Sequence, residues 1–258
     1  MSLSRKVKTI ISVGAIVGVL AITTPILTIS LLNYNNTIKV TLLYNAGVMI
    51  ESKGIRIYID PITLPQNYSD LPADAVLITH PHEDHSQGVT ISLVQKENTV
   101  NIFPETLTSQ ISQHNGIGVK PGDQFTVGHV TITAFYMYTF SLEGYPASHP
   151  QEENWTSYII DFGGYRIFHA GDSKNIPEYS QLTGTIDIAM LPLGPGCQSM
   201  ADQEVVDALY VIRPDYFIPI HYTSSSYSTF VLSYVDDIEL INCEFIGLTN
   251  FEMHKFKK

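Results

Sequence analysis

The sequence predicts an α+β domain of two β-sheets packed face to face with helices outside, preceded by one transmembrane helix. Strand-like segments come in two runs, with helical segments between and after them, which predicts the two layers of sheet. Residues 9–38 carry no charge, which predicts the membrane segment. We therefore divide the 258 residues into a cytoplasmic tip and anchor, residues 1–33, and a domain, residues 34–258.

The amino-terminal segment has the features of a membrane-spanning helix. Its apolar part, residues 9–32, is 24 residues long, and a helix of that length covers about 36 Å, enough to cross a bilayer. Arg5, Lys6 and Lys8 precede it, and the positive-inside tendency would keep them cytoplasmic with the domain outside. A cleaved signal peptide is the alternative, but its apolar region is shorter and no small-x-small cleavage site follows. The sequence thus predicts a single-pass membrane protein with an extracytoplasmic domain.

Charge and cysteine content narrow the classes of partner. The formal net charge is −11, and the three bases before residue 9 leave 25 acids against 11 bases in the remainder. A nucleic-acid partner is therefore not expected, because binding a phosphate backbone needs a basic face. Cys197 and Cys243 are not spaced as a metal pair, and whether they form a disulfide stays open, as does the oligomeric state.

The elements follow in order from hydrophobic periodicity and turn residues. In the first half we expect a loop at 62–72, helices from the capping residue Ser86 to 96 and over 104–113, and strands at 38–43, 48–52, 55–59, 75–79 and 100–103. In the second half we expect a long loop at 138–154, helices at 200–212 and 229–237, and strands at 125–127, 130–136, 155–162, 166–169, 186–191, 216–220 and 243–246.

A histidine-rich turn after the strand at 75–79 is the strongest chemical pattern. His80 and His82 are two residues apart, so an extended backbone points both to one side, while Asp84 and His85 can face a second ion from the following turn. Imidazole and carboxylate together suit zinc, and can also hold iron or manganese. We therefore expect these four residues to be metal ligands.

Three further ligands are expected at other strand ends and in the long loop. Asp172 follows Gly171, which lets the backbone bend after the strand at 166–169, and His221 ends the strand at 216–220. Each alone is as well explained by turn chemistry or by an ordinary histidine. His149, in the loop at 138–154, is the least secure because a solvated loop histidine is the alternative.

The remaining histidines are given other roles. His169 lies three residues before Asp172, whose carboxylate could bridge two ions, and we expect His169 to orient a ligand or an oxyanion rather than bind metal. His114 and His254 lack strand context and are placed on the surface, while His129 is placed in a hairpin turn.

With these pieces assembled, the chain resembles the metallo-β-lactamase superfamily over about residues 38–248. The resemblance rests on His80-x-His82-x-Asp84-His85, His149, Ala-Gly-Asp172-Ser, Ile-Pro-Ile-His221-Tyr and the segments at 44–48, 59–61 and 190–194. It looks like the branch of ascorbate-phosphate-lactonase-like and N-acyl-phosphatidylethanolamine-phospholipase-D-like hydrolases. Many relatives carry a histidine where Asn45 stands here.

The resemblance implies an αββα four-layer sandwich with the site at one sheet edge. It implies one metal held by His80, His82 and His149, another held by Asp84, His85 and His221, Asp172 as the bridge, and Asp60 fixing a histidine. The cofactors would be two divalent ions, Zn²⁺ first, with Mn²⁺ or Fe²⁺ as alternatives.

The expected activity is that of a metal-dependent hydrolase. A hydroxide generated between two cations would attack an ester, lactone or phosphodiester in a small-molecule or lipid-derived substrate, with Asp84 and His169 as the expected catalytic residues. No Gly-x-Ser-x-Gly turn is present. A membrane-tethered metal- or ligand-binding protein without turnover is the alternative, and a nuclease is disfavoured by the acidic charge.

Overall fold

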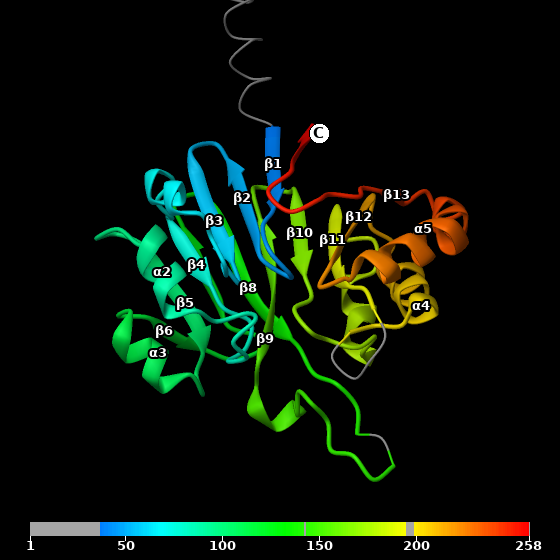
Figure 1. The fold of residues 1–258 in the computed structure, drawn as a ribbon, viewed down its shortest axis with the longest axis horizontal. Helices are drawn as coiled ribbons and strands as arrows, with labels where there is room; N and C mark the ends of the chain where they lie inside the picture. The colour runs from blue at the N-terminus through cyan, green and yellow to red at the C-terminus, as the bar shows by residue number, and fades with distance from the viewer. Residues whose placement is uncertain (1–36, 142, 195–198, 258) are drawn as a thin grey trace, which may run out of the picture.

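The computed structural model describes residues 37–257 except 142 and 195–198, and it shows two β-sheets packed face to face (Figure 1). Helices lie on the two outer faces, so the layers are helix, sheet, sheet, helix. The predicted α+β sandwich is confirmed in the described residues. The predicted anchor lies outside them, and among residues 37–257, with those gaps, no helix is long and apolar enough to cross a bilayer.

The first sheet has seven strands, and its first and last strands in the chain are neighbours. Its spatial order is β14 (Met253–Lys257), β1 (Thr37–Leu42), β2 (Val48–Ser52), β3 (Ile55–Ile59), β4 (Ala75–Leu77), β5 (Val100–Pro104) and β6 (Ile117–Val119). Strands β3 to β6 pair in parallel, so the carboxyl ends of β3 and β4 lie at one edge.

The second sheet also has seven strands. Its spatial order is β13 (Glu244–Phe245), β12 (Tyr216–Ile220), β11 (Ile188–Pro192), β10 (Arg166–His169), β9 (Thr156–Asp161), β8 (Val130–Tyr136) and β7 (Gln124–Val127). Strands β10, β11 and β12 are parallel to one another. Their carboxyl ends therefore reach the same edge, where the polar residues that follow β10 and β12 come together.

Helices cover the outer face of each sheet. The α-helices are α2 (Gly88–Val94), α3 (Thr108–Gln113), α4 (Asp202–Ile212) and α5 (Ser224–Glu239), and the 3₁₀ turns are η1 (Gln66–Asp70), η2 (Gln151–Glu153) and η3 (Pro177–Leu182). In Figure 1, α2 and α3 lie beside β4 to β6, and α4 and α5 lie beside β11 to β13.

Alternation along the strands divides the core into layers. In β1, Ile38, Val40 and Leu42 are buried between the sheets, so the residues between them point to the outer face. A second cluster lies under α4 and α5, and a third under η1 and α2. The αββα layering that the resemblance implies is confirmed.

Helix boundaries differ from the expected ones because the capping residues differ. Helix α2 starts at Gly88 after Gln87, so Ser86 does not cap it. Helix α3 starts at Thr108 rather than at 104. Helix α5 starts at Ser224, because Thr223 and Ser226 form a capping box that the expected range of 229–237 missed.

Strand β14 was not predicted, yet its Phe256 is part of the core. Phe256 is 2% exposed and its ring lies 4.9 Å from that of Tyr216 in the second sheet. We expect Phe256→Ala to lower the free energy of unfolding by about 3 kcal/mol, because it removes a buried ring and leaves a cavity. Equilibrium urea unfolding measures this, and Met253→Ala on the exposed side of β14 is the control. Equal losses in the two variants would contradict the burial of Phe256.

Candidate metal centre

The seven expected ligands meet at the carboxyl edge of the two sheets. The turn after β4 supplies His80, His82, Asp84 and His85, the loop after β10 supplies Asp172, and the residue after β12 is His221. His149 comes from the loop between β8 and β9. His80 and His221, which are 141 positions apart in the chain, thus belong to one cluster.

The ligand atoms form the groups that the resemblance implied. Within each of three groups the donor atoms lie no more than 4.8 Å apart, and the groups are His80–His82–His149, Asp84–His85–His221 and His80–His85–Asp172. Asp172 reaches both sides: its Oδ2 lies 3.7 Å from His149 Nε2 and 3.5 Å from His221 Nε2. Its position between the two histidine groups is that of a bridging carboxylate.

Hydrogen bonds behind the cluster orient two of the imidazoles. His85 Nδ1 lies 2.7 Å from Asp60 Oδ2, and Thr79 Oγ1 donates to the same oxygen at 2.6 Å. His80 Nδ1 lies 2.9 Å from Thr79 Oγ1. With Nδ1 of both rings facing outward, Nε2 of both rings points toward the centre, where it can bind a metal ion once it carries no proton. Asp60 therefore has the supporting role that the resemblance implied.

Serine hydroxyls orient two more imidazole rings in the same way, with Nδ1 facing away from the centre. His149 Nδ1 lies 3.1 Å from Ser148 Oγ, and His221 Nδ1 lies 3.3 Å from Ser199 Oγ. The Nε2 atoms of both rings again point toward Asp172. Four imidazoles therefore present the same nitrogen to the centre.

The backbone around the cluster is in a strained region at several points. His221, Asp60 and Asn45 all have positive φ, at 52°, 48° and 59°, a conformation that L-residues adopt rarely. Gly171 also has positive φ, and a Cβ there would lie 2.6 Å from Met137 Sδ. The glycine is thus required for the turn that places Asp172, as the sequence predicted.

Several of the potential metal-ligating atoms have no hydrogen-bond partner within the protein, which a bound cation would supply. Four of them are buried and have no hydrogen-bond partner among the described residues: His85 Nε2, His149 Nε2 and both carboxylate oxygens of Asp172. Leaving such groups unpaired is costly, and buried ionisable groups in proteins are paired or coordinate metals. The chemistry and placement of these atoms therefore fit divalent ions.

The electrostatics of the cluster favour an ionised Asp172 and divide the imidazoles into two groups, His80 and His149 with lowered pKa values and His85 and His221 with raised ones. Burial alone would raise the pKa of Asp172, but His85 and the other histidines outweigh it and lower this pKa. Burial lowers the pKa of His149 to about 4 and, with its histidine neighbours, that of His80. His85 and His221 differ: burial opposes their charged forms, but Asp172 and Asp60 raise the pKa of His85 to about 10, and Asp84 and Asp172 raise that of His221.

The raised pKa of His85 predicts that metal binding releases a proton. Below a pKa of about 10 the metal-free ring is charged, so an entering cation must displace its proton, and apparent zinc affinity should rise about tenfold per pH unit near neutrality. Calorimetric titration of the metal-free protein in two buffers of different ionisation enthalpy counts the protons released. A count of zero would contradict a protonated His85.

Asn45 is part of the centre, which the sequence did not predict. Its Nδ2 donates to Asp84 Oδ2 at 3.3 Å and to the Asp84 carbonyl at 3.2 Å, while its own carbonyl accepts from the His221 amide at 3.1 Å. It therefore joins two ligands of the same proposed ion. The pairing of β1 with β2 places this turn at the site, and in the sequence only the resemblance over residues 44–48 points to it.

We expect Asn45→Gly to weaken metal binding on the Asp84 side about tenfold, as losses of supporting hydrogen bonds do. Glycine keeps the left-handed backbone, so the change removes only the side-chain amide. The measurement is a zinc titration that resolves successive binding steps. Asn115→Gly is the control, because Asn115 also has positive φ, at 50°, and is exposed. Unchanged affinity would assign Asn45 to the backbone turn alone.

Trp155 is a second residue that the sequence did not assign to the site. Its ring lies 5.4–5.5 Å from the rings of His80, His82 and His149, and it is 8% exposed. It packs against this half of the centre.

The structure corrects the roles given to other histidines. His169 is buried, with Nε2 2.8 Å from the Ala46 carbonyl and Nδ1 accepting from the Gly171 amide at 3.2 Å. Both nitrogens contact backbone atoms, and through the Gly171 amide His169 positions the turn before Asp172. A catalytic role for His169 stays a prediction. His114 is buried beside Phe103, not on the surface, because α3 folds it inward.

Two other histidines lie away from the centre. His254 lies in β14 and is half-buried, so it does have strand context. His129 is exposed in the turn between β7 and β8, as expected. Neither belongs to a metal-binding group among the described residues.

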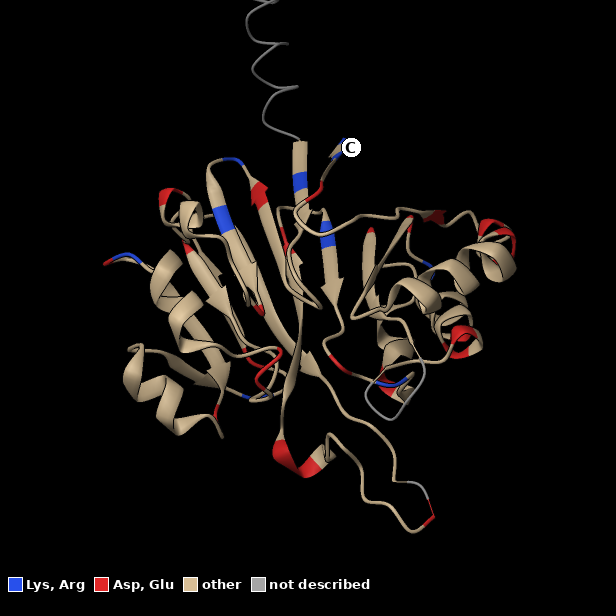
Figure 2. Cartoon of the chain, in the orientation of Figure 1, with Lys and Arg blue, Asp and Glu red and all other residues tan. Residues whose placement is uncertain are grey.

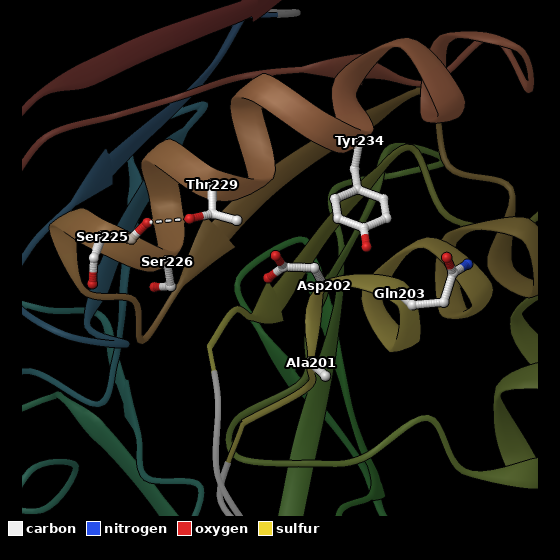
Figure 3. Close-up of a pocket in the computed structure, with 7 residues that line it drawn as sticks. All are labelled: Ala201, Asp202, Gln203, Ser225, Ser226, Thr229 and Tyr234. Carbon is white, nitrogen blue, oxygen red and sulfur yellow. Dashed lines mark hydrogen bonds between the residues drawn. The ribbon is translucent and has the colours of Figure 1, made fainter.

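A cavity of about 480 Å³ lies elsewhere, between α4 and α5 (Figure 3). It is lined by Ala201, Asp202, Gln203, Ser225, Ser226, Thr229 and Tyr234. None of these is among the seven ligands. Convergence of ligand atoms, and not cavity size, therefore locates the candidate centre.

Comparison with known proteins agrees with this geometry. The family described as "Beta-lactamase superfamily domain" matches residues 39–221. A UPF0173 protein of Pyrococcus abyssi is 30% identical over 182 residues, covering 69% of this chain and 80% of its own. A UPF0173 metal-dependent hydrolase of Geobacillus is 30% identical over 206 residues, covering 72% and 86%.

Solved structures share the fold. Igni18, a metallo hydrolase from Ignicoccus hospitalis, has a TM-score of 0.70 at 21% identity and covers 86% of this chain and 99% of its own. CmlA, a diiron β-hydroxylase from Streptomyces venezuelae, has a TM-score of 0.65 at 14% identity and covers 86% and 54%. The expected superfamily is thereby confirmed, and the chain belongs to the β-lactamase superfamily.

Proposed function

We propose that this protein is a metal-dependent hydrolase that acts on an ester, a lactone or a phosphodiester through two divalent ions. The observation that carries the proposal is the set of buried, unpartnered donor atoms on His85, His149 and Asp172. Relatives that share the family and are named metal-dependent hydrolases support it. The substrate class follows the lactonase-like and phospholipase-D-like branch that the sequence resembles.

The residues divide into two ligand sets and a bridge. His80, His82 and His149 would hold one ion, Asp84, His85 and His221 the other, and Asp172 would contact both. When bound, such ions lower the pKa of a coordinated water to about 7 and polarise a substrate oxygen. Zn²⁺ suits this ligand set, and Mn²⁺ or Fe²⁺ can replace it.

The open side of the centre is marked by Asp84. Its side chain is 47% exposed, whereas those of His85 and Asp172 are fully buried. A hydrogen bond from His221 is the main cause that lowers the pKa of Asp84, so this carboxylate is ionised wherever the enzyme works. Substrate therefore approaches beside Asp84, while Trp155 closes the opposite side.

The test is metal content and hydrolysis in the same preparation. Full-length protein purified without added metal is analysed for elements, then assayed with zinc or manganese on a bis-aryl phosphodiester, a lactone and a thioester. We expect about two ions per chain and hydrolysis of at least one probe, both lost in His82→Ala and Asp84→Ala. Hydrolysis by metal-free protein would refute the proposal. Stable metal binding with no turnover of any probe would favour the alternative, a tethered binding protein.

We further infer that residues 1–33 anchor the protein in a membrane with the domain on the extracytoplasmic side. The uncharged residues 9–38 and the preceding Arg5, Lys6 and Lys8 support this. The anchored protein should resist extraction from membranes by alkaline carbonate, and a protease added outside intact cells should digest the domain. If carbonate extracts the protein into the soluble fraction, the proposed anchor is refuted, while the proposed hydrolase activity is not affected.

A further inference from the structure

The end of the first sheet at which β1 starts carries an unusual concentration of positive charge, on β14, β1, β3 and the turn between β2 and β3. Five of the ten Lys and Arg residues that the structure describes lie on these strands or their connecting turn: Lys39, Lys53, Arg56, Lys255 and Lys257. Figure 2 shows blue positions on β1, on β3 and on the turn between β2 and β3, near the end of the sheet from which β1 starts, with a red position on β2 among them. We call this surface the basic face. It stands out in a chain whose formal net charge is −11.

The four lysines of the basic face have no ion pair among the described residues, whereas Arg56 is paired with Glu51. In the strand register, Lys39 lies directly opposite Lys255 on one side and opposite Glu51 on the other. Glu51, however, is bound by Arg56 at 2.8 Å. Among the described residues no ion pair involves Lys39, Lys255 or Lys257. Like charges directly opposite each other destabilise a sheet, so an anionic partner outside the domain would stabilise this one.

At the end where β1 starts, this face is uncovered and partly apolar. Further along the same strands the outer face is covered, because Met49 and Tyr58 pack against η1 and α2, and α2 and α3 lie beside β4 to β6 (Figure 1). On β14, Lys255 and Lys257 are exposed, and Met253 is 42% exposed beside Phe251 at 39%. Lysines next to exposed apolar side chains are a combination that binds the interface of an anionic bilayer.

The chain itself indicates which anionic surface lies nearest. Strand β1 starts at Thr37, at this end of the sheet. Only four residues, 33–36, separate it from the apolar segment at 9–32. Four residues span at most about 14 Å. The metal centre is at the other end of the strands, where β4, β10 and β12 end.

We propose that the basic face binds the anionic phospholipid headgroups of the membrane that holds the amino-terminal anchor. This inference rests on the proposed anchor and not on the hydrolase activity. It places the metal centre on the side of the domain that faces away from the bilayer, so substrate reaches it from the aqueous phase.

The experiment measures lysine acetylation rates in the full chain. The protein is reconstituted in nanodiscs of phosphatidylcholine alone or with phosphatidylglycerol, and mass spectrometry follows each lysine. Acetylation of Lys39, Lys255 and Lys257 should be about fivefold slower in the anionic discs, and the difference should vanish near 1 M salt. Lys120, exposed and on a distant turn, is the internal control and should not change.

Charge-reversal variants make the same test through a different reporter. In Lys255→Glu with Lys257→Glu, protection of Lys39 should be lost, whereas Lys120→Glu with Arg213→Glu, also exposed, should retain it. If a variant fails to fold, the wild-type comparison of the two lipids still decides. If the protein does not insert into the nanodiscs, it is instead mixed with vesicles of the same lipid compositions. This measurement tests binding of the basic face without insertion of the anchor.

Two outcomes would overturn the proposal. Equal acetylation in neutral and anionic lipid would show that headgroup charge does not matter. Equal protection in both lipids and in detergent would show that the amino-terminal segment or a second copy covers the face. Both outcomes leave the metal content and the hydrolase assay untouched, so failure here is separable from failure of the proposed function.

Discussion

Asp172→Asn should remove bound metal and lower hydrolysis by about 10³-fold, since metal catalysis supplies several kcal/mol of transition-state stabilisation. Asp172 is fully buried and its two oxygens face His80, His85, His149 and His221 at 3.2–3.8 Å. An amide of the same shape supplies one neutral oxygen where two ions would share a carboxylate. The measurement is elemental analysis together with kcat/KM on the best probe substrate.

The control for that variant is Asp236→Asn on the exposed side of α5. It makes the same chemical change without touching the centre, and it should leave metal content and rate unchanged. If Asp172→Asn retains two ions and full activity, the carboxylate does not bridge, and the ligand assignment has to be replaced.

Asp60→Asn should lower the free energy of unfolding of the metal-free protein by about 3 kcal/mol, because buried charge-assisted hydrogen bonds are lost and donors are left unpaired. Asp60 accepts from the Thr79 amide at 2.8 Å and from Thr79 Oγ1, and it holds His85 Nδ1. Asparagine tolerates the positive φ at this position, so the backbone is preserved. Urea unfolding in the presence of a chelator gives the change in stability.

The same variant should bind zinc 10- to 100-fold more weakly, roughly the effect of losing the partner that orients a ligand. Asp123→Asn is the control, because Asp123 also accepts a backbone hydrogen bond, from Lys120 at 2.9 Å, but far from the centre. A stable Asp60→Asn protein with unaltered affinity would show that the imidazole of His85 is fixed by packing alone.

The ligands were predictable because each sits where a strand ends. Buried runs such as β4 and β12 are recognisable from their apolar residues, and parallel strands bring their carboxyl ends to one edge. Residue type then identifies the chemistry, since His82 and Asp84 have little reason to follow a core strand otherwise. His149 could be placed only by the resemblance, because a long loop has no periodicity.

What the sequence missed depends on pairing between distant segments. Asn45 acts through a contact with Asp84, 39 positions away, and a single asparagine in a turn carries no such information. His114 is buried by the packing of α3 against β5. Its neighbours in the sequence are polar, so the sequence gives no sign of this burial. In β14 only Phe256 is fully buried while lysines alternate with it, so its apolar signal is weak.

The neighbouring positions of β1 and β14 have a consequence for how the protein is made. Strand β1 pairs with β2 on one side and with Met253–Lys257 on the other. During synthesis β1 leaves the ribosome long before β14, so its second hydrogen-bonding edge stays unpaired until residues 253–257 have emerged. Until then the nascent chain carries an open strand edge, a template for wrong pairing. Deletion of residues 253–257 should for this reason cause aggregation even though every ligand of the centre is present.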